Sequence, residues 1–275
     1  MTPKQEHPNA KGTHQRGVKM ITNYHTHTKR CHHAVGEDED YVQSAVKTGY
    51  DVLGFSDHAP YYYENGYLSY YKMHPDEAEE YAESIFALRE KYRDKIQIHM
   101  GFEAEYYPEI FPEALKLWKR VGAEYVILGQ HFIANEYSKA EHAFGPSDNE
   151  KLRRYTDRCI EAIETEKFSY IAHPDVLKYV GCDEEFYEHE AKRLVECATR
   201  HETPLEINLQ GLYEGRHYPN KAFWQAAAQL SPTVILGTDA HTPILLENIN
   251  ARKQATKLAK DLGLNLIDKL EFKPI

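Results

Sequence analysis

Histidine and acidic residues follow apolar runs at six places in this sequence of 275 residues. Each run is as long as a β-strand, and the first imidazole or carboxylate comes within three residues of its end. The residues concerned are His25, His27, His58, Glu103, His131, His173, Asp239 and His241. Imidazoles and carboxylates are ligands for zinc, iron and manganese. Six strand ends that supply such ligands predict a metal site to which several strands contribute.

Two pairs of these residues are separated by a single position. His25 and His27 form one pair, and Asp239 and His241 form the other. Side chains two residues apart on an extended chain point to the same side, so both members of a pair can face one site. Among 16 histidines about one such pair arises by chance, so the prediction rests on the whole set. With His33 there are nine candidate ligands. That number exceeds the roughly four ligands of one zinc ion and suits two or three divalent ions that share a carboxylate.

The apolar runs alternate with helical patterns along the chain. The expected strands are 18–24, 50–56, 96–102, 124–129, 168–172, 204–208 and 232–237. The expected helices are 37–48, 75–92, 110–121, 148–165, 183–201, 219–230 and 244–262, and 264–275 is expected to form a last strand or tail. Because each strand is followed by a helix, the strands should be parallel, with the helices outside. The sequence predicts an α/β fold, a single-domain (βα) barrel of seven strands whose C-terminal ends converge on one face.

Charge and composition restrict the class of protein. The net charge is −10 and the sequence pI about 5.9, which argues against nucleic acid as a partner. No apolar stretch is long enough to cross a membrane, and the N-terminus lacks a hydrophobic secretory core. The four cysteines form no CxxC pair, as is typical of reduced thiols in a cytoplasmic protein. We expect a cytoplasmic protein with a small-molecule substrate. The sequence does not decide its oligomeric state.

The N-terminal 17 residues differ from the rest of the chain. They are polar and have no periodicity, so we expect a disordered extension at 1–17 and the folded domain at 18–275. His7 and His14 are interpreted as solvated residues without a role in the metal site. Met20 lies just before the first strand and is an alternative start of the protein.

The motifs HTH, SDH, GFE, GQHF, AHPD and GTDAH, in this order, resemble the metal motifs of the PHP (polymerase and histidinol phosphatase) superfamily. The resemblance implies a distorted seven-stranded (βα) barrel with a trinuclear metal site. It also implies the ligands of each ion: His25, His27, Glu103 and Asp239 on the first, Glu103, His131 and His173 on the second, and His33, His58 and His241 on the third. His33 is preferred over the adjacent His32 because of its spacing from His27.

The segments GFEAEYYPE, GQHFI, LEINLQGLYEGR and YPN resemble the histidinol-phosphate phosphatase branch of that superfamily. The branch implies a phosphoric monoester hydrolase that converts L-histidinol phosphate to L-histidinol and phosphate in histidine biosynthesis. The expected nucleophile is a hydroxide that bridges the ions held by Glu103, His131 and Asp239. Arg216 is the first candidate for binding the substrate phosphate, since guanidinium matches phosphate oxygens. Arg154 and Arg158 are interpreted as residues of a solvated helix face.

Other functions remain open on the sequence. The chain could act on another small phosphate ester or on phosphotyrosine. An amidohydrolase-type C–N hydrolase also places HxH, His and Asp at strand ends, but His33, His58 and Glu103 fit that class poorly. A non-catalytic metal-binding scaffold is the remaining alternative. The metals themselves could be zinc, iron or manganese, and the residues do not decide between them.

Several neighbours of the motifs have two interpretations. Asp57 and Asp175 either orient imidazole N–H groups or cap turns. Cys31 is interpreted as a packed thiol rather than as a nucleophile. The segment 59–75 holds six tyrosines, Tyr61, Tyr62, Tyr63, Tyr67, Tyr70 and Tyr71. It forms either a lid over the substrate or an aromatic loop packed on the barrel rim.

Overall fold

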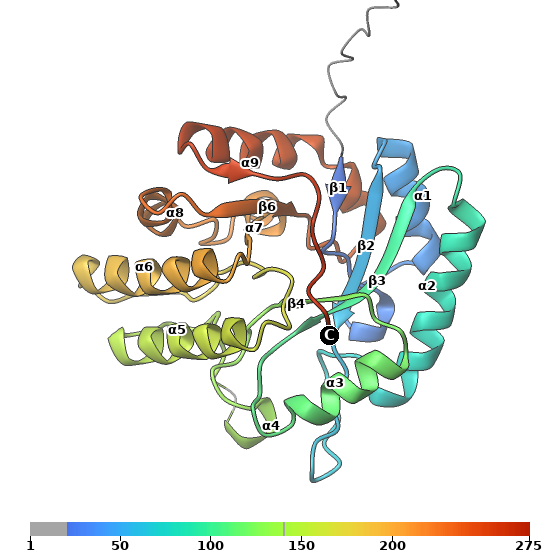
Figure 1. Cartoon of the computed structure of the whole chain (residues 1–275), viewed down its shortest axis with the longest axis horizontal. Helices are drawn as coiled ribbons and strands as arrows, with labels where there is room; N and C mark the ends of the chain where they lie inside the picture. The colour runs from blue at the N-terminus through green and yellow to red at the C-terminus, as the bar shows by residue number, and fades with distance from the viewer. Residues whose placement is uncertain (1–20, 140) are drawn as a thin grey trace, which may run out of the picture.

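The computed structural model describes residues 21–139 and 141–275 (Figure 1). The predictions for the extension at 1–17, its two histidines and Met20 lie outside the described residues. The described chain folds into a curled layer of parallel strands with helices around it, as the alternating pattern predicts. No helix in these residues is long and apolar enough to cross a membrane.

The strands form two parallel sheets. The first has the order β1-β2-β3-β4 and the second the order β5-β6-β7. Their bounds are β1 Thr22–Asn23, β2 Val52–His58, β3 Gln97–Ala104, β4 Tyr125–Leu128, β5 Leu205–Asn208, β6 Thr233–Gly237 and β7 Asn265–Leu266. The register of β2 against β3 sets His58 beside Glu103. Strand pairing alone therefore places two predicted ligands from different strands next to each other.

Hydrogen bonds join the two sheets at both edges. Between β4 and β5, Ser169 N–H donates to the carbonyl of Val126 at 2.7 Å, and Ile171 N–H donates to that of Pro204 at 3.0 Å. At the other edge, His27 N–H donates to the carbonyl of Ala240 at 3.0 Å. The expected strand 168–172 is thus a bridging segment with isolated pairings rather than a full strand. The last regular strand is β7, which lies within 264–275, the expected last strand or tail.

Seven longer helices occupy the seven predicted helical regions. They are α1 Asp38–Thr48, α2 Ala78–Tyr92, α3 Phe111–Arg120, α5 Asn149–Glu164, α6 Glu184–Arg200, α8 Lys221–Ala228 and α9 Ile249–Asp261. Shorter turns are α4 Glu136–Lys139, α7 Leu209–Glu214, η1 Lys29–Cys31, η2 Pro75–Glu77 and η3 Pro243–Glu247. Local chemistry sets the ends of α1: a capping box links Glu37 and Asp40, and Gly49 ends the helix at φ 85°.

The end of the fold where the strands begin is closed by apolar side chains. Tyr24, Tyr125 and Ile235 are buried there in a cluster distinct from the main core under the helices. Phe272 from the C-terminal segment stacks on Tyr125, with ring centres 4.8 Å apart. Figure 1 shows this segment crossing the near face of the molecule. Polar side chains at the strand C-termini therefore gather at the opposite end, away from this apolar plug.

Candidate metal centre

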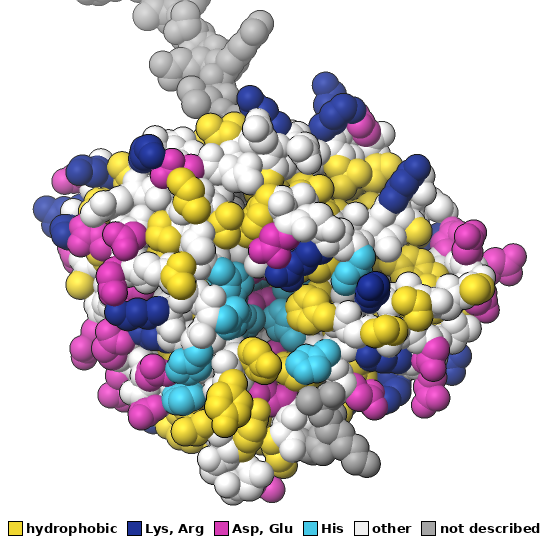
Figure 2. Space-filling view, turned by 180° about the vertical axis from the view of Figure 1, so that it is seen from behind, with side chains coloured by type: hydrophobic (Ala, Val, Ile, Leu, Met, Phe, Trp, Pro, Cys, Tyr) yellow, Lys and Arg dark blue, Asp and Glu magenta, His cyan; other side chains and the backbone are white. Residues whose placement is uncertain are grey.

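All nine predicted ligands lie together at the C-terminal ends of the strands. His58 ends β2 and Glu103 lies in β3. His173 follows the bridging segment 168–172, and the others come from segments that follow a strand or η1. Figure 2 shows histidine side chains gathered in a hollow of the face opposite to that in Figure 1. Eight of the nine side chains are buried or half-buried, and His33 is exposed. The strand-end pattern therefore brings together residues as far apart in sequence as His25 and His241.

Glu103 is the centre of this cluster. Its carboxylate contacts five imidazoles: His173 Nε2 at 2.9 Å, His58 Nδ1 at 3.1 Å, His131 Nε2 at 3.4 Å, and His25 and His27 Nε2 at 3.5 Å each. Within the cluster, no other side chain contacts as many imidazoles on both sides, the side of His25 and the side of His131. This is the geometry of a carboxylate that can bridge two ions.

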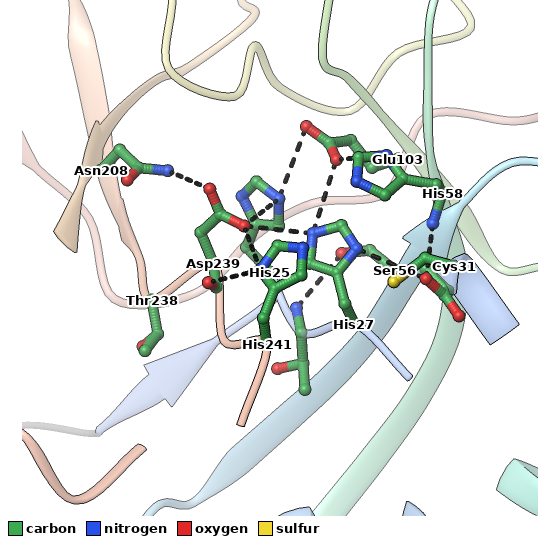
Figure 3. A network of polar contacts seen from close by, with 12 residues as sticks. His25, His27, Cys31, Ser56, His58, Glu103, Asn208, Thr238, Asp239 and His241 are labelled. Atoms are coloured by element: carbon green, nitrogen blue, oxygen red, sulfur yellow. Dashed lines mark hydrogen bonds and ion pairs between the residues drawn. The ribbon is translucent and has the colours of Figure 1, made fainter. Parts of the chain in front are cut away.

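Asp239 faces Glu103 across the two imidazoles that follow β1 (Figure 3). Its Oδ1 lies 3.1 Å from His27 Nε2 and 3.5 Å from His25 Nε2. Its Oδ2 accepts a hydrogen bond from Asn208 Nδ2 at 3.0 Å. Asn208 thus holds one carboxylate oxygen of Asp239, and the other oxygen faces the imidazoles at the centre of the cluster.

A third group contains imidazoles only. His33 Nε2 lies 3.0 Å from His241 Nε2, and the ring centres of His33 and His58 are 5.2 Å apart. His32 points elsewhere: its ring lies 4.6 Å from that of His74, with its Nε2 4.0 Å from a carboxylate oxygen of Glu77. The structure therefore places His33, and not His32, in the cluster.

Most of the imidazoles point their Nε2 atoms inward, whereas His58 faces Glu103 with Nδ1. In four of them Nδ1 faces an oxygen that can only accept a hydrogen bond, so Nδ1 carries the proton and Nε2 presents a lone pair. These contacts are His25 to Glu206 at 2.8 Å, His131 to Glu105 at 3.1 Å, His33 to the Cys31 carbonyl at 2.7 Å and His241 to the Asp239 carbonyl at 3.2 Å.

These donors fit divalent cations better than they fit one another. The inward lone pairs of His33 Nε2 and His241 Nε2 face each other at 3.0 Å. Two neutral lone pairs repel at this distance. In addition, His25 Nε2, His27 Nε2 and one Glu103 oxygen are buried without a hydrogen-bond partner. Cations between these atoms would satisfy all of them, since buried polar atoms are rarely left without partners.

The protonation states suit metal binding at the two acids. Burial raises the pKa of Glu103 and of Asp239, but the surrounding imidazoles outweigh it and hold both pKa values well below their ordinary range. Burial and the neighbouring His27 cation lower the pKa of His33, His58 and His241, so these three are neutral at pH 7. Ionised carboxylates and neutral imidazoles are the forms that coordinate metal.

His25 and His27 behave in the opposite way. Burial lowers the pKa of His25, but Glu206, Asp239 and Glu103 outweigh it and raise the pKa to about 10. The pKa of His27 is raised above its ordinary value by Asp239 and Asp57 in spite of its burial. In the absence of a cation, protons on these two imidazoles thus compensate the carboxylates.

The backbone is strained at two of the candidate ligands. His173 and Asp239 have φ values of 29° and 54°, in the left-handed region that residues other than glycine avoid. Such strain is characteristic of functional sites. A Cβ on Gly129 would lie 1.9 Å from Glu103 Oε1, and one on Gly237 would lie 2.4 Å from the Glu206 carboxyl carbon. These two glycines, in GQH and GTDAH, are a sequence signal for buried carboxylates beside them.

Several residues that hold the site have no role predicted from the sequence. Glu206 contacts His25, and Asn208 donates to Glu206 at 2.6 Å as well as to Asp239. Both residues lie in β5, within the LEIN segment, and both are buried. Their alternation with Leu205 and Ile207 could have identified them, because polar residues in a buried strand require a partner.

The two aspartates with open interpretations differ in the structure. Asp57 Oδ1 lies 3.4 Å from His27 Nδ1, and the hydroxyl of Thr28 donates to its other oxygen, so Asp57 is placed to orient an imidazole. Asp175 instead accepts from Trp224 Nε1 at 3.0 Å and from the backbone N–H of Asn220 at 2.5 Å. Asp175 thus anchors the start of α8 rather than a histidine.

A cavity of about 480 Å³ opens onto the cluster. Arg216 lines it, as the sequence predicts, and its guanidinium contacts Tyr218 OH at 2.7 Å and Glu214 at 2.6 Å. Arg154 and Arg158 pair with Glu141 and Glu161 and do not line the cavity. Aromatic rings complete the wall, namely Tyr71, Phe132, Phe144 and Tyr218.

The tyrosine-rich segment contributes one ring to this cavity. Tyr71 lines it, while Tyr61 and Tyr63 are buried in the core. Tyr62 and Tyr70 are exposed, at 53% and 79%. Most of the segment is therefore either packed or solvated, and Tyr71 alone of its six tyrosines faces the site.

Comparison with known proteins agrees with this geometry. A model of the PHP domain matches residues 23–210, which contain seven of the nine candidate ligands. A probable histidinol-phosphatase of Deinococcus radiodurans is 25% identical over 233 residues, which cover 80% of this chain and 85% of that protein. A histidinol-phosphatase of Bacillus subtilis is 28% identical over 121 residues, covering 42% of this chain and 45% of the relative.

A solved structure has the same fold. Histidinol phosphate phosphatase from Lactococcus lactis, complexed with zinc, L-histidinol and phosphate, superposes with a TM-score of 0.72 at 18% identity. The match covers 92% of this chain and 100% of that one. Because the PHP model spans more than half of the chain, the protein belongs to the PHP family.

Proposed function

We propose that this protein is a metal-dependent phosphomonoesterase that hydrolyses L-histidinol phosphate to L-histidinol and phosphate, a step of histidine biosynthesis. The observation that carries the proposal is the cluster of nine ligand-type side chains around Glu103, which opens into a cavity lined by Arg216. The names of the Deinococcus and Bacillus relatives support the choice of substrate. So does the Lactococcus enzyme, whose structure contains zinc, histidinol and phosphate.

The proposal includes a trinuclear centre on a distorted seven-stranded barrel formed by residues 18–275. One ion would be held by His25, His27, Glu103 and Asp239, a second by Glu103, His131 and His173, and a third by His33, His58 and His241. Zinc, iron and manganese all suit this mixture of imidazole and carboxylate. When bound, such ions neutralise a phosphate dianion and supply hydroxide at neutral pH as the nucleophile.

The protein's own residues position the substrate. Arg216 would donate to phosphate oxygens, and Glu214 and Tyr218 hold its guanidinium at the cavity wall. Phe144 stacks on His131 with ring centres 5.7 Å apart and planes 12° apart, so the wall next to a proposed ligand is aromatic. Aromatic side chains of this kind suit the imidazole of the leaving alcohol and exclude water around it.

The direct test compares kcat/KM for histidinol phosphate, phosphotyrosine and an aryl phosphate, with the protein supplied with manganese, zinc or iron. We expect a clear preference for histidinol phosphate, at about 10⁴ M⁻¹s⁻¹ or above. Activity on the aryl ester alone would keep the phosphatase and remove the histidine assignment. Activity on phosphotyrosine alone would move the protein to another substrate class, and no hydrolysis of any ester with bound metal would refute the proposal.

The role of Arg216 has a matched control. Arg216→Ala should raise KM by about 10-fold or more while the metal content stays the same, because only phosphate binding is lost. Arg154→Ala removes an exposed guanidinium that pairs with Glu141 and should change neither quantity. Equal kinetics for the two variants would remove Arg216 from the site.

A further inference from the structure

A lysine is buried in the wall of the cavity. Lys72 follows Tyr71 in the tyrosine-rich segment, and its side chain is 2% exposed. Its Nζ lies 3.2 Å from Glu105 Oε1 and also contacts Glu136, and both of these acids are buried. Removing an ammonium group and two carboxylates from water costs free energy that their mutual attraction often only balances, so stability alone does not explain this arrangement.

Glu105 connects Lys72 to a proposed metal ligand. The same oxygen, Oε1, accepts from Lys72 Nζ and lies 3.1 Å from Nδ1 of His131. The other oxygen, Oε2, is buried without a hydrogen-bond partner. The orientation of this carboxylate therefore depends on two contacts to a single oxygen, and only one of them, Lys72, comes from outside the proposed metal centre.

Lys72 is itself fixed from the side away from the metal centre. The hydroxyls of Tyr63 and Tyr67 lie 3.3 and 3.1 Å from the two carboxylate oxygens of Glu136. Tyr61 donates to the backbone carbonyl of Glu105 at 2.6 Å. Three tyrosines of the segment thus hold the two acids that Lys72 contacts.

The aromatic residue after the ligand adds a further contact. The Lys72 ammonium lies 4.6 Å from the centre of the Phe132 ring, within the range of a cation–π interaction. The backbone N–H of Met73 donates to the carbonyl of His58 at 3.2 Å, so the segment is also tied to the end of β2. Lys72 therefore packs next to His131, through Phe132. The segment that carries Lys72 is anchored at His58, through Met73.

We propose that Lys72 is a positioning residue for the phosphatase reaction, acting on His131 through Glu105. The inference rests on the function proposed above. Without the ammonium group, Glu105 and Glu136 would be two buried carboxylates that face the same space. Their repulsion would turn Glu105 away from His131, and the imidazole would lose the contact that fixes its tautomer and orientation. The segment 59–75 would then serve as a support of the metal centre.

The first experiment compares Lys72→Met, which replaces the unbranched stem but lacks the ammonium group, with Lys72→Arg, which keeps the charge. For Lys72→Met we expect kcat to fall about 10- to 100-fold per folded, metal-containing protein, with KM within about threefold. Lys72→Arg should recover part of the loss. The control is Lys91→Met, which removes an exposed lysine that pairs with Glu39 at 2.6 Å, and should leave kcat unchanged.

A double-mutant cycle tests whether Lys72 acts through Glu105. Glu105→Gln alone should lower kcat, and adding Lys72→Met to it should cost less than about twofold more. Independent, multiplying losses would refute the proposal, because they would mean that Lys72 does not work through that carboxylate. If Lys72→Met does not fold, the cycle of Lys72→Arg with Glu105→Gln asks the same question.

Manganese titration of the metal-free protein gives a readout that does not depend on activity. Lys72→Met should weaken one class of manganese site about tenfold and leave the others unchanged, and Glu105→Gln should remove that difference. Unchanged manganese affinity together with unchanged kcat would overturn the proposal. A wild-type protein that hydrolyses no phosphate ester would refute the proposed function, yet the titration would still decide whether Lys72 supports His131.

Discussion

The two ends of the candidate metal centre are built from different chemistry. The inner group consists of His25, His27, Glu103 and Asp239, which are all buried (Figure 3). The outer group consists of His33, His58 and His241, and it contains no carboxylate. The pKa values of the inner imidazoles are raised by the acids beside them, whereas burial and the His27 cation lower those of the outer group.

The difference in chemistry leads us to expect that the two groups differ in their affinity for a cation and in how easily a cation reaches them. Two ionised carboxylates in a buried site attract a cation strongly, and the inner group is held by the segment after β1, by β3 and by the turn after β6. The outer group offers only neutral imidazoles, and His33 reaches it from an exposed turn after η1. We infer that the inner group retains metal tightly and that the outer group, next to the cavity, exchanges it more readily.

Removal of the shared carboxylate should have the largest effect. Glu103→Gln keeps the shape of the side chain but loses the charge that faces five imidazoles. We expect kcat to fall at least about 10³-fold and metal content to fall at more than one site, as measured by elemental analysis after gel filtration. Glu214→Gln, at the cavity wall, is the control and should keep its metal. Loss of activity with full metal content would contradict a bridging role for Glu103.

Removal of an outer ligand should have a smaller effect. His33→Ala leaves the carboxylates intact, so we expect one ion to be lost and kcat to fall about 10- to 100-fold. His32→Ala changes a neighbouring imidazole whose ring lies against His74 and should alter neither metal content nor kcat. If His32→Ala lost the ion and His33→Ala did not, the outer group would have been assigned wrongly.

A partner outside the ligand set should have a smaller effect again. Glu206 lies 2.8 Å from His25 Nδ1 and fixes the tautomer that turns Nε2 inward. Glu206→Gln retains an oxygen acceptor but removes the charge, so we expect a loss of about tenfold in kcat or in manganese affinity. An unchanged affinity would show that the inner group does not depend on this support, and the comparison between the groups would then rest on Glu103 and Asp239 alone.

The positions of the candidate ligands could be predicted from sequence because parallel strands end at a common edge. A residue such as His58 needs only its own strand and the register with β3 to reach Glu103. The same logic predicted the helices and the position of Arg216 on the cavity wall. His33 was also predictable, since its distance along the chain from His27 limits where it can lie. Local patterns were sufficient wherever position along one strand decided the contact.

The supporting residues could not be predicted in that way. Lys72 reaches Glu105 from a segment without helix or strand, and the contact depends on how tyrosines pack in the folded protein. Asp175 shows the converse: it follows a predicted ligand in sequence, but its partners are Trp224 and Asn220 of a distant segment. The segment 168–172 has a strand-like composition, yet only isolated pairings form there. Each of these outcomes depends on contacts between distant parts of the chain.

The smallest effect is expected in the stability of the metal-free protein, where the two groups should respond to pH in opposite directions. The pKa of His25 is about 10 in the folded protein, above its ordinary value of 6.5. Its contribution to stability is thus complete below pH 6.5 and is lost as pH rises towards 10. His58 and His241 have folded pKa values well below 6.5, so their unfolded forms bind protons first and stability falls as pH drops below 6.5.

Thermal denaturation in the presence of a chelator should therefore show a Tm that decreases by a few degrees on both sides of about pH 6.5. Manganese should abolish the decrease at high pH, because the ion replaces the proton on the inner imidazoles. The variant His58→Ala should reduce the decrease at low pH and leave the high-pH side unchanged, and Lys91→Met serves again as the control. A Tm that rises between pH 7 and 9 without metal would mean that the inner carboxylates do not hold a proton on His25. The proposed electrostatic difference between the inner and outer groups would then be wrong.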